Sequence, residues 1–123
     1  MIFIEFILKR FQLYIVKKNP WNIKNISNPS EEIQLAAVKR NPVVICYIDN
    51  PTHKVQLTAV KKSGCTIQFI KDPCEEIQRE ALTQTLRAIE CIYNLSENID
   101  INEIISNNNK IENICKNWRK TGF

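Results

Sequence analysis

Pairs of basic side chains recur at a fixed interval in this chain of 123 residues. The pairs are Lys17–Lys18, Lys39–Arg40 and Lys61–Lys62, and each follows the previous one after 22 residues. Ammonium and guanidinium groups bind anions, such as the carboxylates of an acidic protein surface or the phosphates of a nucleic acid. If the elements that carry the pairs stack on one another, the six side chains form one row, here called the basic row.

The cysteines follow no comparable pattern. They are Cys46, Cys65, Cys74, Cys91 and Cys115. Because they are odd in number, widely spaced and without a C-x-x-C pair, the sequence predicts neither a zinc site nor a disulfide framework. We expect reduced thiols that fill space in a cytoplasmic protein, and a redox role is the less favoured alternative. No cofactor is expected.

The single histidine, His53, does not indicate a catalytic site either. Neighbouring units hold glutamate at its position, so we interpret it as a drifted helix-capping residue rather than a general base. The chain contains no glycine-rich phosphate loop, no H-E-x-x-H motif and no G-x-S-x-G motif. We therefore expect a protein that is not an enzyme.

The basic pairs belong to a repeat that runs through the whole chain. The stretches 11–27, 33–49 and 55–71 align without a gap, and isoleucine recurs at positions 4, 26, 48, 70, 92 and 114. A fixed period of about 20 to 50 residues is typical of a solenoid, in which each unit buries its apolar face against its neighbours. The sequence predicts a single all-α domain over residues 1–123, an α-solenoid of about five stacked 22-residue helical hairpins with atypical terminal caps. The predicted units are 1–27, 28–49, 50–71, 72–93 and 94–123.

Each unit reads as a helix, a break and a shorter second segment. Asn28, with equivalents Asn50, Asp72 and Asn94, is predicted to be the N-cap, followed in the first three units by a proline at the first helical position. The glutamate three residues after the cap would complete a capping box. In the second unit the first helix is expected from about Pro29 to Arg40. A second helix is expected from about Val43 to Ile48, with a 3₁₀ or extended form as the alternative.

The columns that vary along the chain predict how the first helix of each unit is oriented. Ala37 and its equivalents stay small, which suits a close contact between neighbouring helices, whereas the variable column of Ala36 is expected to be exposed. A column of glutamines falls inside the buried arc. We interpret it as a ladder of amides that bond to the backbone of the adjacent unit, with ligand contact as the less favoured alternative. The glutamines are Gln12, Gln34, Gln56 and Gln78.

Both ends of the chain depart from the repeat and read as terminal caps. Residues 1–10 are expected to continue into the first helix without a break. Residues 74–93 lack the Asn-Pro break, so they form either one longer helix or a different turn. The apolar segment from Met1 to Leu8 is too short to cross a membrane, and no membrane association is expected. This segment is instead a candidate contact for a homodimer.

A resemblance to known repeats accompanies this pattern. The motif NPSEEIQLAAVKRNPVVICYI begins at Asn28 and is followed by NPTHKVQLTAVKKSGCTIQFI. These stretches resemble short tandem α-helical repeats of uncharacterised function in bacterial, phage and giant-virus proteins. The resemblance covers about residues 11 to 93. It implies a solenoid of α-hairpins and supplies no catalytic residues.

A repeat scaffold of this kind binds another macromolecule, and the sequence favours a protein partner. The predicted contact residues are the six members of the basic row together with Trp21. A small viral or phage inhibitor of a host factor is one special case, suggested by a composition rich in Ile, Asn and Lys. The alternative is a nucleic-acid-binding protein that uses the basic row, and it is less favoured because a net charge of +4 is mild.

Overall fold

The described residues form helices joined by short turns. The computed structural model describes residues 2–109, and no residue in that range lies in a β-strand. In chain order the elements are α1 (Ile2–Lys18), η1 (Pro20–Asn25), α2 (Glu31–Arg40), η2 (Pro42–Tyr47), α3 (His53–Lys62), η3 (Gly64–Phe69), α4 (Glu75–Gln84) and η4 (Leu86–Cys91). Residues 101–109 are also helical. The prediction of an all-α chain is confirmed for the part that the structure describes.

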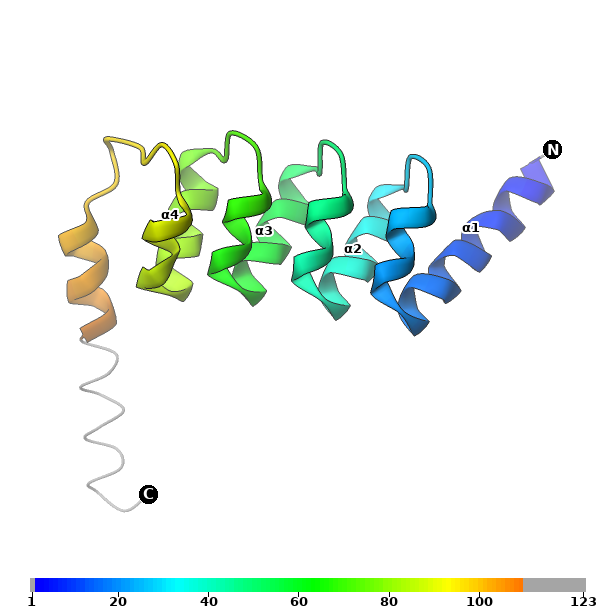
Figure 1. The fold of residues 1–123 in the computed structure, drawn as a ribbon, viewed down its shortest axis with the longest axis horizontal. Helices are drawn as coiled ribbons and strands as arrows, with labels where there is room; N and C mark the ends of the chain where they lie inside the picture. The colour runs from blue at the N-terminus through cyan, green and yellow to red at the C-terminus, as the bar shows by residue number, and fades with distance from the viewer. Residues whose placement is uncertain (1, 110–123) are drawn as a thin grey trace, which may run out of the picture.

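The elements alternate between α-helices and 3₁₀ helices, which form two layers of one row (Figure 1). The ten-residue helices α2, α3 and α4 begin 22 residues apart, at Glu31, His53 and Glu75. Each α-helix packs against the next α-helix, and each 3₁₀ helix packs against the next 3₁₀ helix and against the α-helix of its own unit. Helix α1 lies at one end, where its N-terminal part extends beyond the row (Figure 1).

The second segment of each of the first four units is a 3₁₀ helix, the form that the sequence left as an alternative. A 3₁₀ helix rises about 2.0 Å per residue, against about 1.5 Å in an α-helix. The six residues of η2 therefore span about 12 Å, close to the roughly 15 Å of the ten-residue α2. A 22-residue unit can match the lengths of its two layers only if the shorter segment is the more extended helix.

The core follows the columns of the repeat. The alanines at the predicted close contacts, Ala37, Ala59 and Ala81, are fully buried. The large apolar residues one position after and four positions before each of these alanines are buried as well. They are Val38, Val60 and Leu82, and Ile33, Val55 and Ile77. Ala36, however, is partly buried against the core, so the prediction that it is exposed is wrong. The inner α-helices have neighbours on two sides as well as the 3₁₀ layer, which widens the buried arc beyond that of a helix with one partner.

Helices α2, α3 and α4 begin two residues later than predicted, and in α2 and α3 the capping residue differs from the predicted one. Ser30 caps α2, and its Oγ accepts a hydrogen bond from the backbone N–H of Ile33 at 3.5 Å. Thr52 caps α3 in the same way, with its Oγ1 3.4 Å from the nitrogen of Val55. The predicted caps instead adopt the left-handed conformation, with φ of 47° at Asn28 and 49° at Asn50. Asparagine tolerates this conformation better than most residues, so these positions turn the chain and do not cap the helix.

The glutamine column bonds mainly within its own unit, which corrects the predicted ladder. In each inner unit the glutamine Nε2 donates to the carbonyl of the preceding proline, at 2.9 Å from Gln34 to Pro29 and at 3.0 Å in the next two units. Only Gln78 also reaches the adjacent unit, where Nε2 donates to the carbonyl of Asn94 and Oε1 accepts from the N–H of Ser96. The amides therefore close the turn that enters their own helix.

The first and fourth units resolve the questions that the sequence left open. Helix α1 runs unbroken from Ile2 to Lys18, as expected. Helix α4 ends at Gln84, so residues 74–93 do not form one longer helix. Thr85 replaces the breaking asparagine, because its Oγ1 accepts from the N–H of Arg87 as Asn41 Oδ1 accepts from the N–H of Val43. The same turn is thus made with a different side chain.

The fifth unit departs from the period. Its helix begins at residue 101, whereas the period predicts 97. Asp100, rather than Asn94, supplies the N-terminal acceptor, with Oδ1 2.9 Å from the backbone nitrogen of Asn102. Ile99 and Ile104 are still buried, so this unit covers the fourth despite the shift. The predicted continuation through residue 123 lies outside the described residues.

The buried alanine column gives a first prediction. We expect Ala37→Leu to lower the free energy of unfolding by about 1–3 kcal/mol, because a filled helix contact cannot accept three more carbon atoms without strain. Ala36→Leu is the matched control and should cost less than half as much, since one side of Ala36 faces solvent. Urea unfolding of both variants measures the difference. Equal losses would show that the two positions are equally confined.

The helix caps give a second prediction. Thr52→Ala should cost about 1 kcal/mol, because it removes the acceptor for an N–H of the first turn of α3. Asn50→Gly should change stability little, since glycine adopts a positive φ freely, whereas Asn50→Ala should cost about 1 kcal/mol or more. The free energy of unfolding of the three variants is measured. If Asn50→Gly is as damaging as Thr52→Ala, the side chain of Asn50 contributes a cap after all.

Candidate functional site

The structure places the six members of the basic row in the last turns of α1, α2 and α3. All six side chains are exposed. Because α1 packs on α2 and α2 on α3, the three pairs lie on one edge of the row of helices. The row stops at α4, whose last turn carries no basic residue. The period of the sequence thus becomes a local concentration of positive charge.

Some members of the basic row also have contacts within the fold. The Nζ of Lys62 donates to the carbonyl oxygen of Lys39 in the last turn of the neighbouring helix. The Nζ of Lys18 lies 5.7 Å from the ring centroid of Tyr14, in range for a cation–π contact. Cations near a helix C-terminus also complement the helix dipole. These contacts hold the charges at the surface, where the side chains remain exposed.

Exposed apolar side chains accompany the basic row on the 3₁₀ layer. Trp21, the second residue of η1, is 38% exposed and makes an edge-to-face contact with Tyr47 of η2. Their ring centroids are 5.8 Å apart and their planes are inclined by 76°. The other large apolar side chains exposed on the 3₁₀ helices are Val43, Phe69, Leu86 and Ile89. Trp21 follows Lys18 by three residues, so an aromatic anchor lies close to the first basic pair.

The opposite edge, at the first turns of the α-helices, carries paired charges. Lys9 and Glu32 lie 2.7 Å apart, and Glu75 lies 3.1 Å from Arg79. The hydrogen bond from Lys9, and then its charge, hold the pKa of Glu32 below its ordinary value. Hydrogen bonds from Arg79, first, and from Asn98 likewise lower the pKa of Glu75. Lys9 and Glu32 thus join α1 to α2, whereas Glu75 and Arg79 pair within α4.

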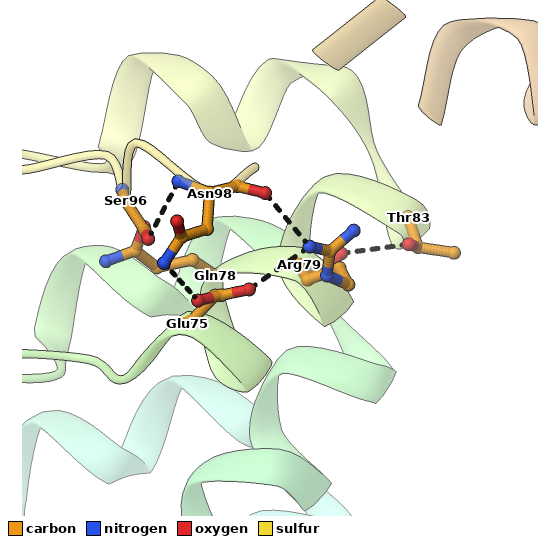
Figure 2. A network of polar contacts seen from close by, with 6 residues as sticks. All are labelled: Glu75, Gln78, Arg79, Thr83, Ser96 and Asn98. Atoms are coloured by element: carbon orange, nitrogen blue, oxygen red, sulfur yellow. Dashed lines mark hydrogen bonds and ion pairs between the residues drawn. The ribbon is translucent and has the colours of Figure 1, made fainter. Parts of the chain in front are cut away.

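The polar network at α4 explains how the irregular fifth unit is held (Figure 2). The carboxylate of Glu75 accepts from Arg79 at 3.1 Å and from Nδ2 of Asn98 at 3.2 Å. Arg79 also donates to the carbonyl of Asn98 at 3.3 Å. Gln78 donates a hydrogen bond to the carbonyl of Asn94 and accepts one of 2.8 Å from the N–H of Ser96. The loop before the last helix is thus fixed by side chains of α4.

Helix α1 has the most exposed apolar surface among the described residues. Eight large apolar side chains of this helix are 52–85% exposed: Ile2, Phe3, Ile4, Phe6, Ile7, Leu8, Phe11 and Tyr14. The sequence analysis singled out only the segment up to Leu8, although the sequence shows that large apolar residues continue at Phe11 and Tyr14. A groove of about 440 Å³ runs along this helix. It is lined by Phe6, Lys9, Arg10, Leu13, Tyr14, Lys17 and Glu32.

The described residues show neither a metal site nor a membrane span. Within 2–109, no group of three or more His, Cys, Asp and Glu side chains is arranged to hold a metal ion. None of the helices in that range has the length and hydropathy needed to cross a bilayer.

Comparisons with known proteins leave the family open. No protein-family model, no curated protein and no solved structure matches this chain. The resemblance to short tandem helical repeats therefore stays a prediction.

The paired carboxylates give a prediction on pH. A glutamate whose pKa is lowered by folding stabilises the fold above its ordinary pKa of about 4.5, and this contribution is lost as the pH falls through the lowered value. We expect the thermal midpoint of the wild type to fall more steeply between about pH 5 and pH 3 than that of the double variant Glu32→Gln, Glu75→Gln. Calorimetry at several pH values measures both. Parallel curves would show that neither pair contributes to stability.

Proposed function

We propose that this chain is a non-catalytic α-solenoid scaffold of about five 22-residue units that binds another protein. The observation that carries the proposal is the basic row, six exposed cations on one edge of three neighbouring helices. The partner is a protein with an acidic surface. The resemblance to tandem helical repeats of bacterial, phage and giant-virus proteins supports a narrower form, in which the scaffold is a small viral or phage inhibitor of a host factor.

The dimensions of the row suit a protein surface. Helices that pack side by side are about 8–10 Å apart, so three units extend the row over roughly 20 Å. Charges alone add speed and orientation to an encounter more than affinity, which comes mainly from buried apolar anchors. Trp21 follows the first basic pair by three residues and contacts Tyr47, and both aromatic side chains are exposed. Charge and apolar contact are thus offered by the same face.

Helix α1 offers a second contact surface that adjoins the row. Lys17 lines the groove of α1 and also belongs to the basic row. A partner segment with apolar and acidic side chains would therefore meet Phe6 and Leu13 in the groove and the cations at its end. A second copy of this chain is the alternative occupant of the apolar segment from Met1 to Leu8. Either occupant would remove from water an apolar surface that monomeric proteins rarely expose.

The competing function is nucleic-acid binding through the same row. Regularly spaced cations favour it, because a phosphate backbone also repeats its charge. The acidic residues of the opposite edge and the mild net charge of +4 weaken it, since the field of the whole molecule steers a polyanion. Binding driven by phosphate contacts falls steeply with salt, and this dependence separates the two functions.

Charge reversal of the row tests the proposal. We expect Lys17→Glu, Lys39→Glu and Lys61→Glu together to abolish capture of the partner from a lysate of the native host, with the fold retained, because exposed charges contribute little to stability. The matched control is Lys24→Glu, Lys54→Glu and Lys71→Glu, which changes the net charge equally at exposed lysines outside the row. Quantitative mass spectrometry of the captured proteins is the measurement, and the control variant should retain the partner.

Two other results would decide against the proposal. A salt-sensitive gel shift of random-sequence DNA or RNA that disappears only in the row variant would establish the nucleic-acid function instead. If the row variant and the control capture the same proteins as the wild type, the row is only a solvated face. The apolar segment of α1 is then the surface to test, beginning with sedimentation measurements of self-association.

A further inference from the structure

Three side chains with complementary chemistry meet where α3 packs on α4. The Sγ of Cys74 lies 3.8 Å from Nδ1 of His53, and the Nε2 of the same imidazole lies 3.0 Å from Oε2 of Glu76. His53 is the first residue of α3, Cys74 is the N-cap of α4 and Glu76 lies in the first turn of α4. All three residues are exposed. The imidazole therefore stands between a thiol and a carboxylate in a place that solutes can reach.

Both Cys74 and His53 depart from the repeat at this junction. The equivalents of Cys74 are Ser30 and Thr52, whose hydroxyl oxygens accept hydrogen bonds from the first turns of their helices. Cys74 makes no such cap bond. The equivalent of His53 in the units on either side is glutamate. Cys74 thus replaces the hydroxyl cap in the fourth unit, and the single histidine, His53, lies in the third unit. The two side chains are in contact.

The thiol, the imidazole and the carboxylate are arranged as in an activated nucleophile, with the imidazole as the base and the carboxylate as its hydrogen-bond partner. A carboxylate that accepts a hydrogen bond from Nε2–H leaves the lone pair of Nδ1 directed toward the sulfur, so the imidazole is able to take the thiol proton. The N-terminus of the ten-residue α4 favours the negative charge that forms on sulfur. A shared metal ion is excluded by geometry, because the thiol and the carboxylate lie at opposite nitrogens of one ring.

We propose that Cys74 is a reactive thiol that hydrogen peroxide or a small organic hydroperoxide converts to a sulfenic acid. The sulfur attacks one peroxide oxygen, so that an S–O bond forms and the O–O bond breaks. The sulfur is oxidised, and the leaving oxygen departs as water or an alcohol. His53 accepts the thiol proton and delivers a proton to that leaving oxygen, which balances the reaction.

The surroundings favour this class of oxidant over a disulfide. Peroxides are uncharged, so Glu75 and Glu76 do not repel them, whereas the common low-molecular-weight disulfides carry carboxylates. The leaving oxygen of a peroxide needs a proton, which the protonated imidazole holds. The sulfenic acid also suits the site, because its new oxygen lies at the N-terminus of α4. This helix lacks a side-chain cap acceptor like those that Ser30 and Thr52 provide for α2 and α3. The site is independent of the basic row, which lies on the opposite edge.

Alkylation rates test the thiol directly in the full chain. Iodoacetamide is the probe, and peptide mass spectrometry follows each cysteine separately. Cys46 is the internal control, because it is exposed like Cys74 and has no histidine partner among the described residues. At pH 7 we expect Cys74 to react at least about tenfold faster than Cys46. This factor is smaller than the rate increase that general-base catalysis supplies in enzymes. Cys91 should be slow, since burial, first, and the neighbouring Cys65 raise the pKa of its thiol.

Variants assign the effect to the imidazole. His53→Gln should lower the rate at Cys74 about tenfold and leave Cys46 unchanged. His53→Glu is a second variant that the fold accepts at this column, as Glu31 and Glu75 show, and it should also lose the enhancement. Treatment with hydrogen peroxide and dimedone should label Cys74 in the wild type and not in these variants. Equal rates at Cys74 and Cys46, or an unchanged rate in both variants, would overturn the proposal.

Discussion

The length of the repeat is the constraint on which the rest of the structure depends. Within 22 residues the chain must complete an α-helix, return, and turn into the next helix, so both layers of the row have to be about equally long. A ten-residue α-helix and a six-residue 3₁₀ helix satisfy this condition, with the left-handed residues at Asn28, Asn50 and Asp72 making the tight turn between units. Because the return is so short, the α-helices come close together, and alanine is the side chain that fills their contacts.

Comparing equivalent positions of the repeat predicted the features that all units share. It failed for features that depend on the local backbone conformation or on contacts of one unit alone. The Asn-Pro breaks, the buried alanines and the all-α class follow from the residues that the repeated columns share. The caps did not, because Asn28 and Ser30 are both good caps and only the backbone conformation separates a turning residue from a capping one. The shift of the last helix to residue 101 depends on side chains of α4 that hold the preceding loop, and no periodic pattern records such bonds.

The same distinction explains which site residues were found. The basic row was predictable because its members are 22 residues apart, and residues one period apart lie on adjacent helices. The contact of Cys74 with His53 spans 21 residues, and that of His53 with Glu76 spans 23. Contacts of this kind run diagonally between units, so an alignment of repeats assigns the partners to different columns. A search at offsets one residue from the period is the signal that would have found them.

The two edges of the α-layer carry charge for different purposes. At the first turns of α2 and α4, contacts 23 residues apart join successive units: Glu32 with Lys9 from the middle of α1, Glu76 with His53 of α3, and Glu75 with Asn98. At the last turns the six cations take part in none of the ion pairs within residues 2–109. Helix dipoles favour acidic residues at the first turns and basic residues at the last turns. They do not explain why the acidic residues are paired while the basic residues face solvent. The charges of the first edge join neighbouring units, whereas those of the second remain exposed on three successive units, and this exposure is what the proposed binding function rests on.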